Sequence, residues 1–156
     1  MIIHACSSCP PTERVAGTTF SVALAGNPNT GKTSLFNALT GENRKVGNWP
    51  GVTVDLAVGS FPDVAGDIRV VDLPGTYSLG AASPDERVAT EFLLSRRADI
   101  AAIVLDASNL ERSLYLAVQV LELDLPALLV VNMGDLAVSR GMDVDLDALS
   151  RRFGVP

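Results

Sequence analysis

The sequence has few cysteines, aromatic residues and basic residues, and these shortages exclude several classes of protein. Its 156 residues include two cysteines, Cys6 and Cys9. Both lie near the start of the chain, so a disulfide between them cannot stabilise the core of the domain. Lysine and arginine number 12 against 18 acidic residues, and the resulting net charge of −6 argues against a broad nucleic-acid-binding surface. No apolar run approaches the roughly 18 residues of a membrane-spanning helix, and no secretory signal is visible. We therefore expect a cytoplasmic domain that binds no nucleic acid.

Short apolar segments, typical of strands buried on both faces of a sheet, alternate with amphipathic segments along the chain. This alternation predicts a three-layer α/β domain with a mostly parallel sheet, to which a hairpin between the second and third strands adds one antiparallel strand. The expected strands are 20–26, 53–61, 67–73, 99–107 and 126–132; the expected helices are 32–41, 83–97, 108–123 and 143–153, with a loop over 42–50 and a turn over 62–66. We expect residues 1–18 to form a flexible tail and 19–156 the domain. Val155 and Pro156 resemble the entry into a further strand, so we expect the domain to be truncated before its last strand and helix.

The strongest chemical signal is the segment GNPNTGKT, which fits the phosphate-loop pattern G-x-x-x-x-G-K-[ST]. It follows an expected strand and opens an expected helix, so its backbone N–H groups and the helix N-terminus can bind phosphate. The Lys32 ammonium can neutralise the β- and γ-phosphates, and the Thr33 hydroxyl can bind Mg²⁺. The expected nucleotide-binding residues here are Gly26, Asn27, Pro28, Asn29, Thr30, Gly31, Lys32, Thr33 and Ser34.

The segment NMGD, from Asn132 through Met133 to Asp135, directly follows an expected buried strand. A carboxylate such as that of Asp135 can accept hydrogen bonds from both N1–H and the amino group of guanine, a pair of donors that adenine lacks. Asn132 can brace the phosphate loop and meet the edge of the base. The alternative is that Asp135 only caps a helix. With a phosphate loop upstream, the pattern predicts selectivity for GTP over ATP.

The segment DLPG lies between these two motifs. Asp72 ends a strand and suits a Mg²⁺ contact; Leu73 and Pro74 lead to Gly75, whose amide suits the γ-phosphate. The alternative is a type II turn, which is compatible with that role. Upstream, Gly51 and Val52 precede Thr53, whose hydroxyl can close on Mg²⁺ or simply begin a strand. Lys32, Thr53 and Gly75 are the residues that we expect to act in hydrolysis.

These motifs in this order resemble the translation-factor-like GTPases, which have the Ras-like P-loop fold. GNPNTGKTSLFNALTG, VGNWPGVTVD, DLPGTYSL, SPDERVATEFL and VVNMGD more narrowly resemble the N-terminal G domain of ferrous iron transport protein B. The resemblance implies GTP/GDP and Mg²⁺ as ligands, with switches at 47–54 and 72–79. It also implies an Asn29-bound K⁺ that assists hydrolysis, although Asn29 can instead hydrogen-bond its own loop or the first switch. A permease domain of the same longer polypeptide in the cell inner membrane is implied as well, and a homo-oligomer is compatible with the sequence.

The sequence departs from Ras-like GTPases after the D-x-x-G motif, where Thr76 replaces the glutamine that orients the attacking water. We therefore expect slow hydrolysis that depends on backbone groups and a cation. Two alternatives stay open: a GTPase of ribosome assembly or RNA modification, and a guanine-nucleotide switch that does not hydrolyse.

Three smaller patterns have simpler explanations. His4, Cys6 and Cys9 offer three metal ligands but lack the fourth of a closed zinc site. The acidic residues at 143, 145 and 147 lack the later positions of a calcium loop, and helix capping explains them better. Trp49 more readily packs on its own domain than stacks on a base.

Overall fold

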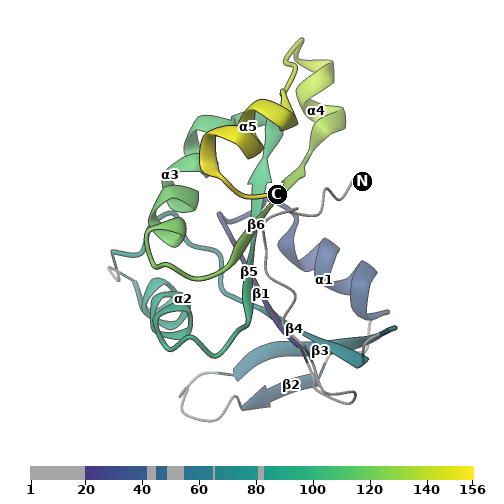
Figure 1. The fold of residues 1–156 in the computed structure, drawn as a ribbon, viewed down its shortest axis with the longest axis vertical. Helices are drawn as coiled ribbons and strands as arrows, with labels where there is room; N and C mark the ends of the chain where they lie inside the picture. Colours follow the sequence, from purple (N-terminus) through teal and green to yellow (C-terminus); the bar gives the residue numbers. More distant parts are fainter. Residues whose placement is uncertain (1–19, 42–44, 49–54, 65, 81–82) are drawn as a thin grey trace.

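The computed structural model describes residues 20–41, 45–48, 55–64, 66–80 and 83–156, which form a twisted six-stranded sheet between layers of helices (Figure 1). The strand order is β2-β3-β4-β1-β5-β6. Among the described strands, β3 alone runs opposite to the other five, because it pairs antiparallel with both β2 and β4 while the remaining pairs are parallel. The predicted three-layer, mostly parallel fold with one antiparallel strand is confirmed. The strands are β1 (Phe20–Gly26), β2 (Lys45–Asn48), β3 (Asp55–Asp63), β4 (Gly66–Asp72), β5 (Ile100–Asp106) and β6 (Ala127–Asn132).

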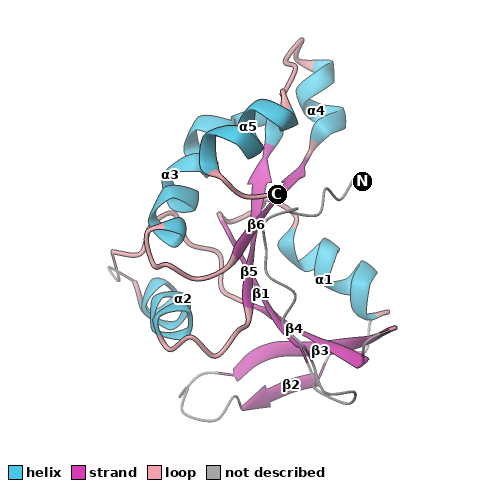
Figure 2. Cartoon of the chain, viewed as in Figure 1, coloured by secondary structure: helices cyan, strands magenta, loops and turns pink. Residues whose placement is uncertain are grey.

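The helices cover the sheet on both faces, with α1 on one side and α2 and α3 on the other (Figure 2). The period-two alternation of β1 explains this: Ala23 and Ala25 belong to the core under α2 and α3, whereas Leu24 packs with Phe36 of α1. Since both faces are buried, both sets of alternate residues are apolar, as the sequence predicted. The helices are α1 (Lys32–Thr40), α2 (Pro84–Leu94), α3 (Leu110–Leu121), α4 (Gly134–Ser139) and α5 (Leu146–Phe153), and a 3₁₀ turn η1 (Ala107–Asn109) precedes α3.

The N-terminus of α2 is held by the capping box that the sequence predicted. The Ser83 hydroxyl accepts from the Glu86 N–H, and the Glu86 carboxylate accepts from the Ser83 N–H. Pro84 occupies the first helical position, where no N–H is needed. The start of α2 is therefore fixed by local chemistry.

Replacing Ser83 by alanine should lower the free energy of unfolding by about 1 kcal/mol, because it leaves a helix N–H without its acceptor. Ser83→Asp keeps an acceptor and serves as the control. Urea denaturation monitored by circular dichroism measures both; equal midpoints for Ser83→Ala and the wild type would contradict the assignment.

Three local predictions were wrong. The predicted loop over 42–50 contains β2, because the outer edge of β3 offers backbone partners such as Ala57 for Val46, and pairing overrides weak strand propensity. The turn predicted over 62–66 is shorter, since β3 and β4 stay paired through Asp63 and Gly66. The helix α4 was not predicted because its six residues are too few to show a helical period.

The end of the chain lies beside the outer strand of the sheet. The Leu129 N–H of β6 donates to the carbonyl of Pro156 at 2.8 Å, so the residues after α5 begin to follow β6. A further strand beyond Pro156 stays a prediction. Among the helices described by the structure, none is both long and apolar enough to span a bilayer.

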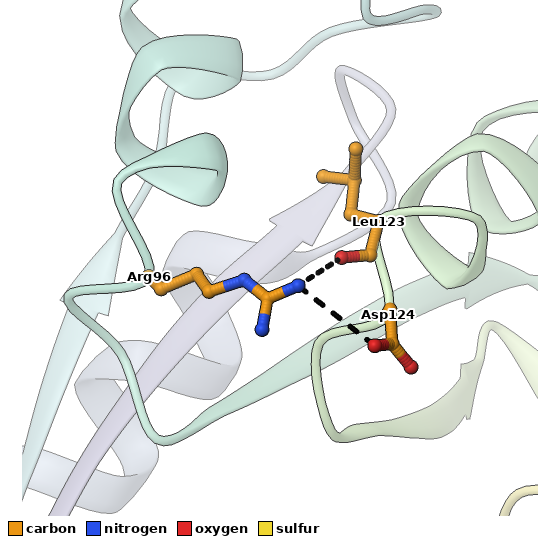
Figure 3. A network of polar contacts seen from close by, with 3 residues as sticks. All are labelled: Arg96, Leu123 and Asp124. Carbon is orange, nitrogen blue, oxygen red and sulfur yellow. Dashed lines mark hydrogen bonds and ion pairs between the residues drawn. The ribbon is translucent and has the colours of Figure 1, made fainter.

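A surface contact joins the segments that follow α2 and α3 (Figure 3). The Arg96 guanidinium donates to the Leu123 carbonyl at 3.3 Å and lies 3.9 Å from the Asp124 carboxylate. The Arg96 and Asp124 side chains are 62% and 97% exposed. Because solvent screens exposed pairs, this contact contributes at most about 1 kcal/mol to stability.

Candidate functional site

The phosphate loop lies at the carboxyl edge of the sheet, between β1 and α1, where parallel α/β sheets bind ligands. Its conformation is held from within, since the Asn27 carbonyl accepts from the Thr30 hydroxyl at 2.9 Å and from Lys32 Nζ at 3.1 Å. All three residues are buried. The ammonium group therefore sits inside the loop rather than in solvent.

Burial dominates the electrostatics of Lys32. Desolvation lowers the pKa of its ammonium, and the negative charge of Asp72 partly opposes that change. A charge in a poorly hydrated place interacts more strongly with an incoming anion than an exposed one does. A phosphate that entered the loop would therefore be strongly attracted by the charge of Lys32.

Two of the three predicted Mg²⁺ ligands, from distant parts of the chain, meet beside this loop. The Thr33 hydroxyl, in the first turn of α1, donates to Asp72 Oδ2, at the end of β4, at 2.9 Å. Hydroxyl and carboxylate oxygens are ligands that suit Mg²⁺. The residues present therefore fit a magnesium ion next to the phosphates.

The segment after β4 packs on the phosphate loop. A Cβ placed on Gly75 would lie 2.9 Å from the Cα of Pro28 and 3.2 Å from Lys32 Nζ, so only glycine allows this approach. The Thr76 N–H donates to the Gly26 carbonyl at 3.2 Å. The backbone of Gly75 consequently lies beside the lysine ammonium.

The residues on either side of Gly75 make contacts within the protein. Leu73 is a core residue whose N–H donates to the carbonyl of Leu24, and Pro74 is half-buried. The Thr76 hydroxyl donates to the Ser78 carbonyl at 2.6 Å. The side chains of Leu73 and Thr76 thus serve the local fold.

The candidate guanine motif is joined to the phosphate loop. Asn132 Nδ2 donates to the Thr30 carbonyl at 2.8 Å, and a Cβ on Gly31 would come within 2.3 Å of that same nitrogen. Met133 is the residue that precedes α4, with a left-handed backbone (φ 59°) and no side-chain cap. Asp135 therefore does not cap this helix; it is exposed in the first turn, where the helix dipole favours a negative charge.

Several residues that the sequence singled out are exposed, cap a helix or lie outside the described part of the chain. Ser34 and Asn29 are exposed, and Asn29 has a left-handed backbone (φ 64°). Asp145 caps α5 by accepting from the Ala148 N–H at 2.8 Å, as the sequence predicted. The described ranges contain no cluster of three metal-ligating His, Cys, Asp or Glu side chains. Outside the described residues lie His4, Cys6, Cys9, Trp49, Gly51, Val52 and Thr53.

Two contacts of Arg112 near this site gave no signal in the sequence. Asn27 Nδ2 donates to the carbonyl of Arg112 in α3 at 3.1 Å, so the Asn27 side chain faces α3. The sequence predicted instead that every residue of the phosphate loop, including Asn27, binds the nucleotide. The Arg112 guanidinium lies 4.0 Å from the centre of the Tyr77 ring. Both contacts join segments far apart in sequence, which no local pattern reveals.

Comparison with known proteins gives one consistent family. The family model described as ferrous iron transport protein B matches residues 20–156. The Fe(2+) transporter FeoB of Salmonella typhimurium is 49% identical over 140 residues, which are 87% of this chain but only 18% of that protein. The G domain of the T. maritima FeoB iron transporter is 45% identical with a TM-score of 0.80, and the match covers 89% of this chain and 85% of that one.

Two further structures agree with these. The FeoB G domain of Methanococcus jannaschii is 41% identical with a TM-score of 0.77, over 88% of this chain and 82% of that one. An S. thermophilus NFeoB variant described as bound to GDP is 47% identical with a TM-score of 0.80, over 88% and 54%. The match of sequence and fold over nearly the entire described part shows that this chain belongs to the ferrous iron transport protein B family.

Proposed function

We propose that the chain is a GTP-binding, slowly hydrolysing G domain that regulates ferrous iron uptake as the cytoplasmic part of a membrane transporter. One observation carries the proposal: Lys32, the Thr33–Asp72 pair and the backbone of Gly75 converge on the phosphate loop, to which Asn132 is hydrogen-bonded. The description of a relative as bound to GDP supports the choice of nucleotide. The family match does not favour a role in ribosome assembly or RNA modification.

Each of these groups would contact a different part of the nucleotide. The loop amides and Lys32 neutralise the β- and γ-phosphates, the Gly75 N–H contacts the γ-phosphate, and Asp135 accepts from guanine. Thr33 and Asp72 would hold Mg²⁺, which would neutralise negative charge on the phosphates. Thr53 completes this set as the proposed first-switch residue.

The burial and hydrogen bonding of Thr76 are the reason that we expect slow hydrolysis. Its side chain is 2% exposed and its hydroxyl is hydrogen-bonded to Ser78, so it does not replace a water-orienting glutamine. The proposed catalysis therefore consists of positioning and charge neutralisation without a covalent step. The γ-phosphate would hold the two switches in an ordered conformation, and hydrolysis would release them.

The remaining partners concern a longer protein. The chain spans 18% of the length of the curated relative, which is described as an Fe(2+) transporter. We propose a membrane permease domain of the same polypeptide, located in the cell inner membrane, as the partner of this domain. A homo-oligomer is compatible with that proposal.

Titration of the purified chain with fluorescent GDP, GTP, ADP and ATP analogues tests the binding function, and phosphate release tests hydrolysis. We expect saturable binding of the guanine nucleotides, no measurable binding of the adenine nucleotides, and slow release of phosphate from GTP. Equal binding of ATP and GTP would overturn the proposal.

Potassium should stimulate hydrolysis through Asn29. No side-chain hydrogen bond engages Asn29 within the described residues, so its carbonyl oxygen is available to a monovalent cation beside the phosphates. Such a cation would offset charge in the transition state, as an arginine finger does in other GTPases. We expect faster GTP turnover in potassium than in sodium chloride, and Asn29→Ala should abolish the difference. A wild-type rate indifferent to the cation would contradict this prediction.

A further inference from the structure

One face of α3 holds the segment that follows DLPG. Arg112 and Gln119 are seven residues apart, two helical turns, and therefore lie on the same face. The Arg112 guanidinium covers the Tyr77 ring at 4.0 Å, and Gln119 Oε1 accepts from the Leu79 N–H at 2.6 Å. Two polar contacts thus fix the segment 77–79 along the helix.

The packing around this segment differs from residue to residue. Tyr77 is 39% exposed and Gly80 is exposed. Gln119 and Tyr115 line a shallow, open hollow together with residues 78–80. Leu79 packs against the main hydrophobic core, whereas Tyr77 and Gly80 are exposed, so the two polar contacts with α3 share with Leu79 in determining the position of the segment.

The same helix also holds the phosphate loop, through the 3.1 Å hydrogen bond from Asn27 Nδ2 to the Arg112 carbonyl. Asn27 is 3% exposed, so this bond is shielded from water. Between the two anchored regions lies Gly75, whose backbone approaches Pro28 and Lys32. Helix α3 therefore contacts both regions and, together with the direct hydrogen bond from the Thr76 N–H to the Gly26 carbonyl, contributes to the position of the segment relative to the loop.

We propose that Arg112 and Gln119 are positioning residues that keep Gly75 beside the Lys32 ammonium and so favour the triphosphate over the diphosphate nucleotide. The inference rests on the proposed function, because it assigns these residues to the γ-phosphate of the nucleotide. They act through the backbone of residues 77–79. Their loss lets Gly75 move away from the site of the γ-phosphate, which GDP lacks.

The first test compares Gln119→Met, which removes the acceptor at similar length, with Gln119→Glu, which keeps an acceptor. Amide hydrogen exchange measured by NMR without nucleotide reports directly on the Leu79 N–H. We expect faster exchange of this amide in Gln119→Met and near wild-type protection in Gln119→Glu. Unchanged protection in Gln119→Met would overturn the proposal irrespective of nucleotide binding.

The second test measures the dissociation constants of GDP and of a non-hydrolysable GTP analogue. For Gln119→Met we expect the constant for the analogue to rise about three- to tenfold, as for loss of one hydrogen bond, while that for GDP changes less than about twofold. Arg112→Met should act in the same direction, and Arg112→Lys should restore part of the effect. Arg96→Met is the matched control, because Arg96 is also an exposed arginine that contacts the protein just beyond α3.

The outcomes separate the inference from the function on which it rests. Wild-type protein that binds no guanine nucleotide overturns the proposed function, while the hydrogen-exchange result still reports the anchoring. A parallel rise of both constants indicates general destabilisation and overturns the positioning role. A lower constant for the analogue also overturns it, since the contacts would then hold Gly75 away from the γ-phosphate.

Discussion

Replacing Gly31 by alanine should abolish tight nucleotide binding while leaving the chain folded. Gly31 has a left-handed backbone (φ 86°), which costs an alanine about 1–2 kcal/mol. The added Cβ would also lie 2.3 Å from Asn132 Nδ2, so the hydrogen bond between Asn132 and Thr30 cannot survive. The phosphate loop and the guanine motif then lose their mutual position. We expect the affinity for GDP to fall by about 100-fold, equivalent to two hydrogen bonds: the one from Asn132 to Thr30 and the predicted one from Asn132 to the edge of the base. Titration with fluorescent GDP measures this change.

Gly41→Ala is the matched control. Gly41 ends the same helix, α1, and also has a left-handed backbone (φ 62°), but nothing lies within 4 Å of a Cβ there. Its replacement should cost stability and leave GDP affinity unchanged. In Gly31→Ala, removal of the Asn132 side chain should cause no further loss, because both changes disrupt the same contacts of Asn132. Equal GDP affinity of Gly31→Ala and Gly41→Ala would contradict this account.

The sequence predicted best the features that depend on a few neighbouring residues. The Ser83–Glu86 capping box, the end of α1 at Gly41 and the Asp145 cap of α5 are all present, since caps are chosen by local hydrogen bonding. Strands buried on both faces were equally evident, because their apolar runs are short and continuous. Local chemistry thus fixed most elements and the position of the phosphate loop between β1 and α1.

Long-range contacts could not be predicted in the same way. The Thr33–Asp72 pair followed from recognised motifs, but the hydrogen bond of Asn27 to Arg112 joins residues 85 positions apart with no pattern of its own. The sequence shows Gln119 as one polar residue on an amphipathic helix; only the fold brings it to the Leu79 amide. Similarly, β2 exists because β3 offers an edge to pair with. Such features depend on which surfaces meet, and propensity does not determine that.

Changing Asp135 to asparagine should exchange the base specificity of the site. The Asp135 carboxylate is exposed beside Met133 and Asn132 and has no side-chain hydrogen bond within the described residues, so it is available to a ligand. Guanine presents two donors, N1–H and the amino group, to an acceptor-only carboxylate. An asparagine offers one acceptor and one donor. It matches xanthine, in which a carbonyl replaces the amino group.

The expected effect is large because each lost hydrogen bond to a charged group costs about 1.5–3 kcal/mol, or about 10- to 150-fold in affinity. Asp135→Asn should therefore bind GTP far more weakly and xanthosine triphosphate more tightly than the wild type does. Asp143→Asn is the charge-matched control, since Asp143 is an exposed carboxylate in the segment before α5, and it should change neither constant. Competition titrations with both nucleotides decide the question. Unchanged GTP affinity with no gain for xanthosine triphosphate would remove Asp135 from the base site, whereas a gain in Asp135→Asn alone places the guanine edge against this carboxylate.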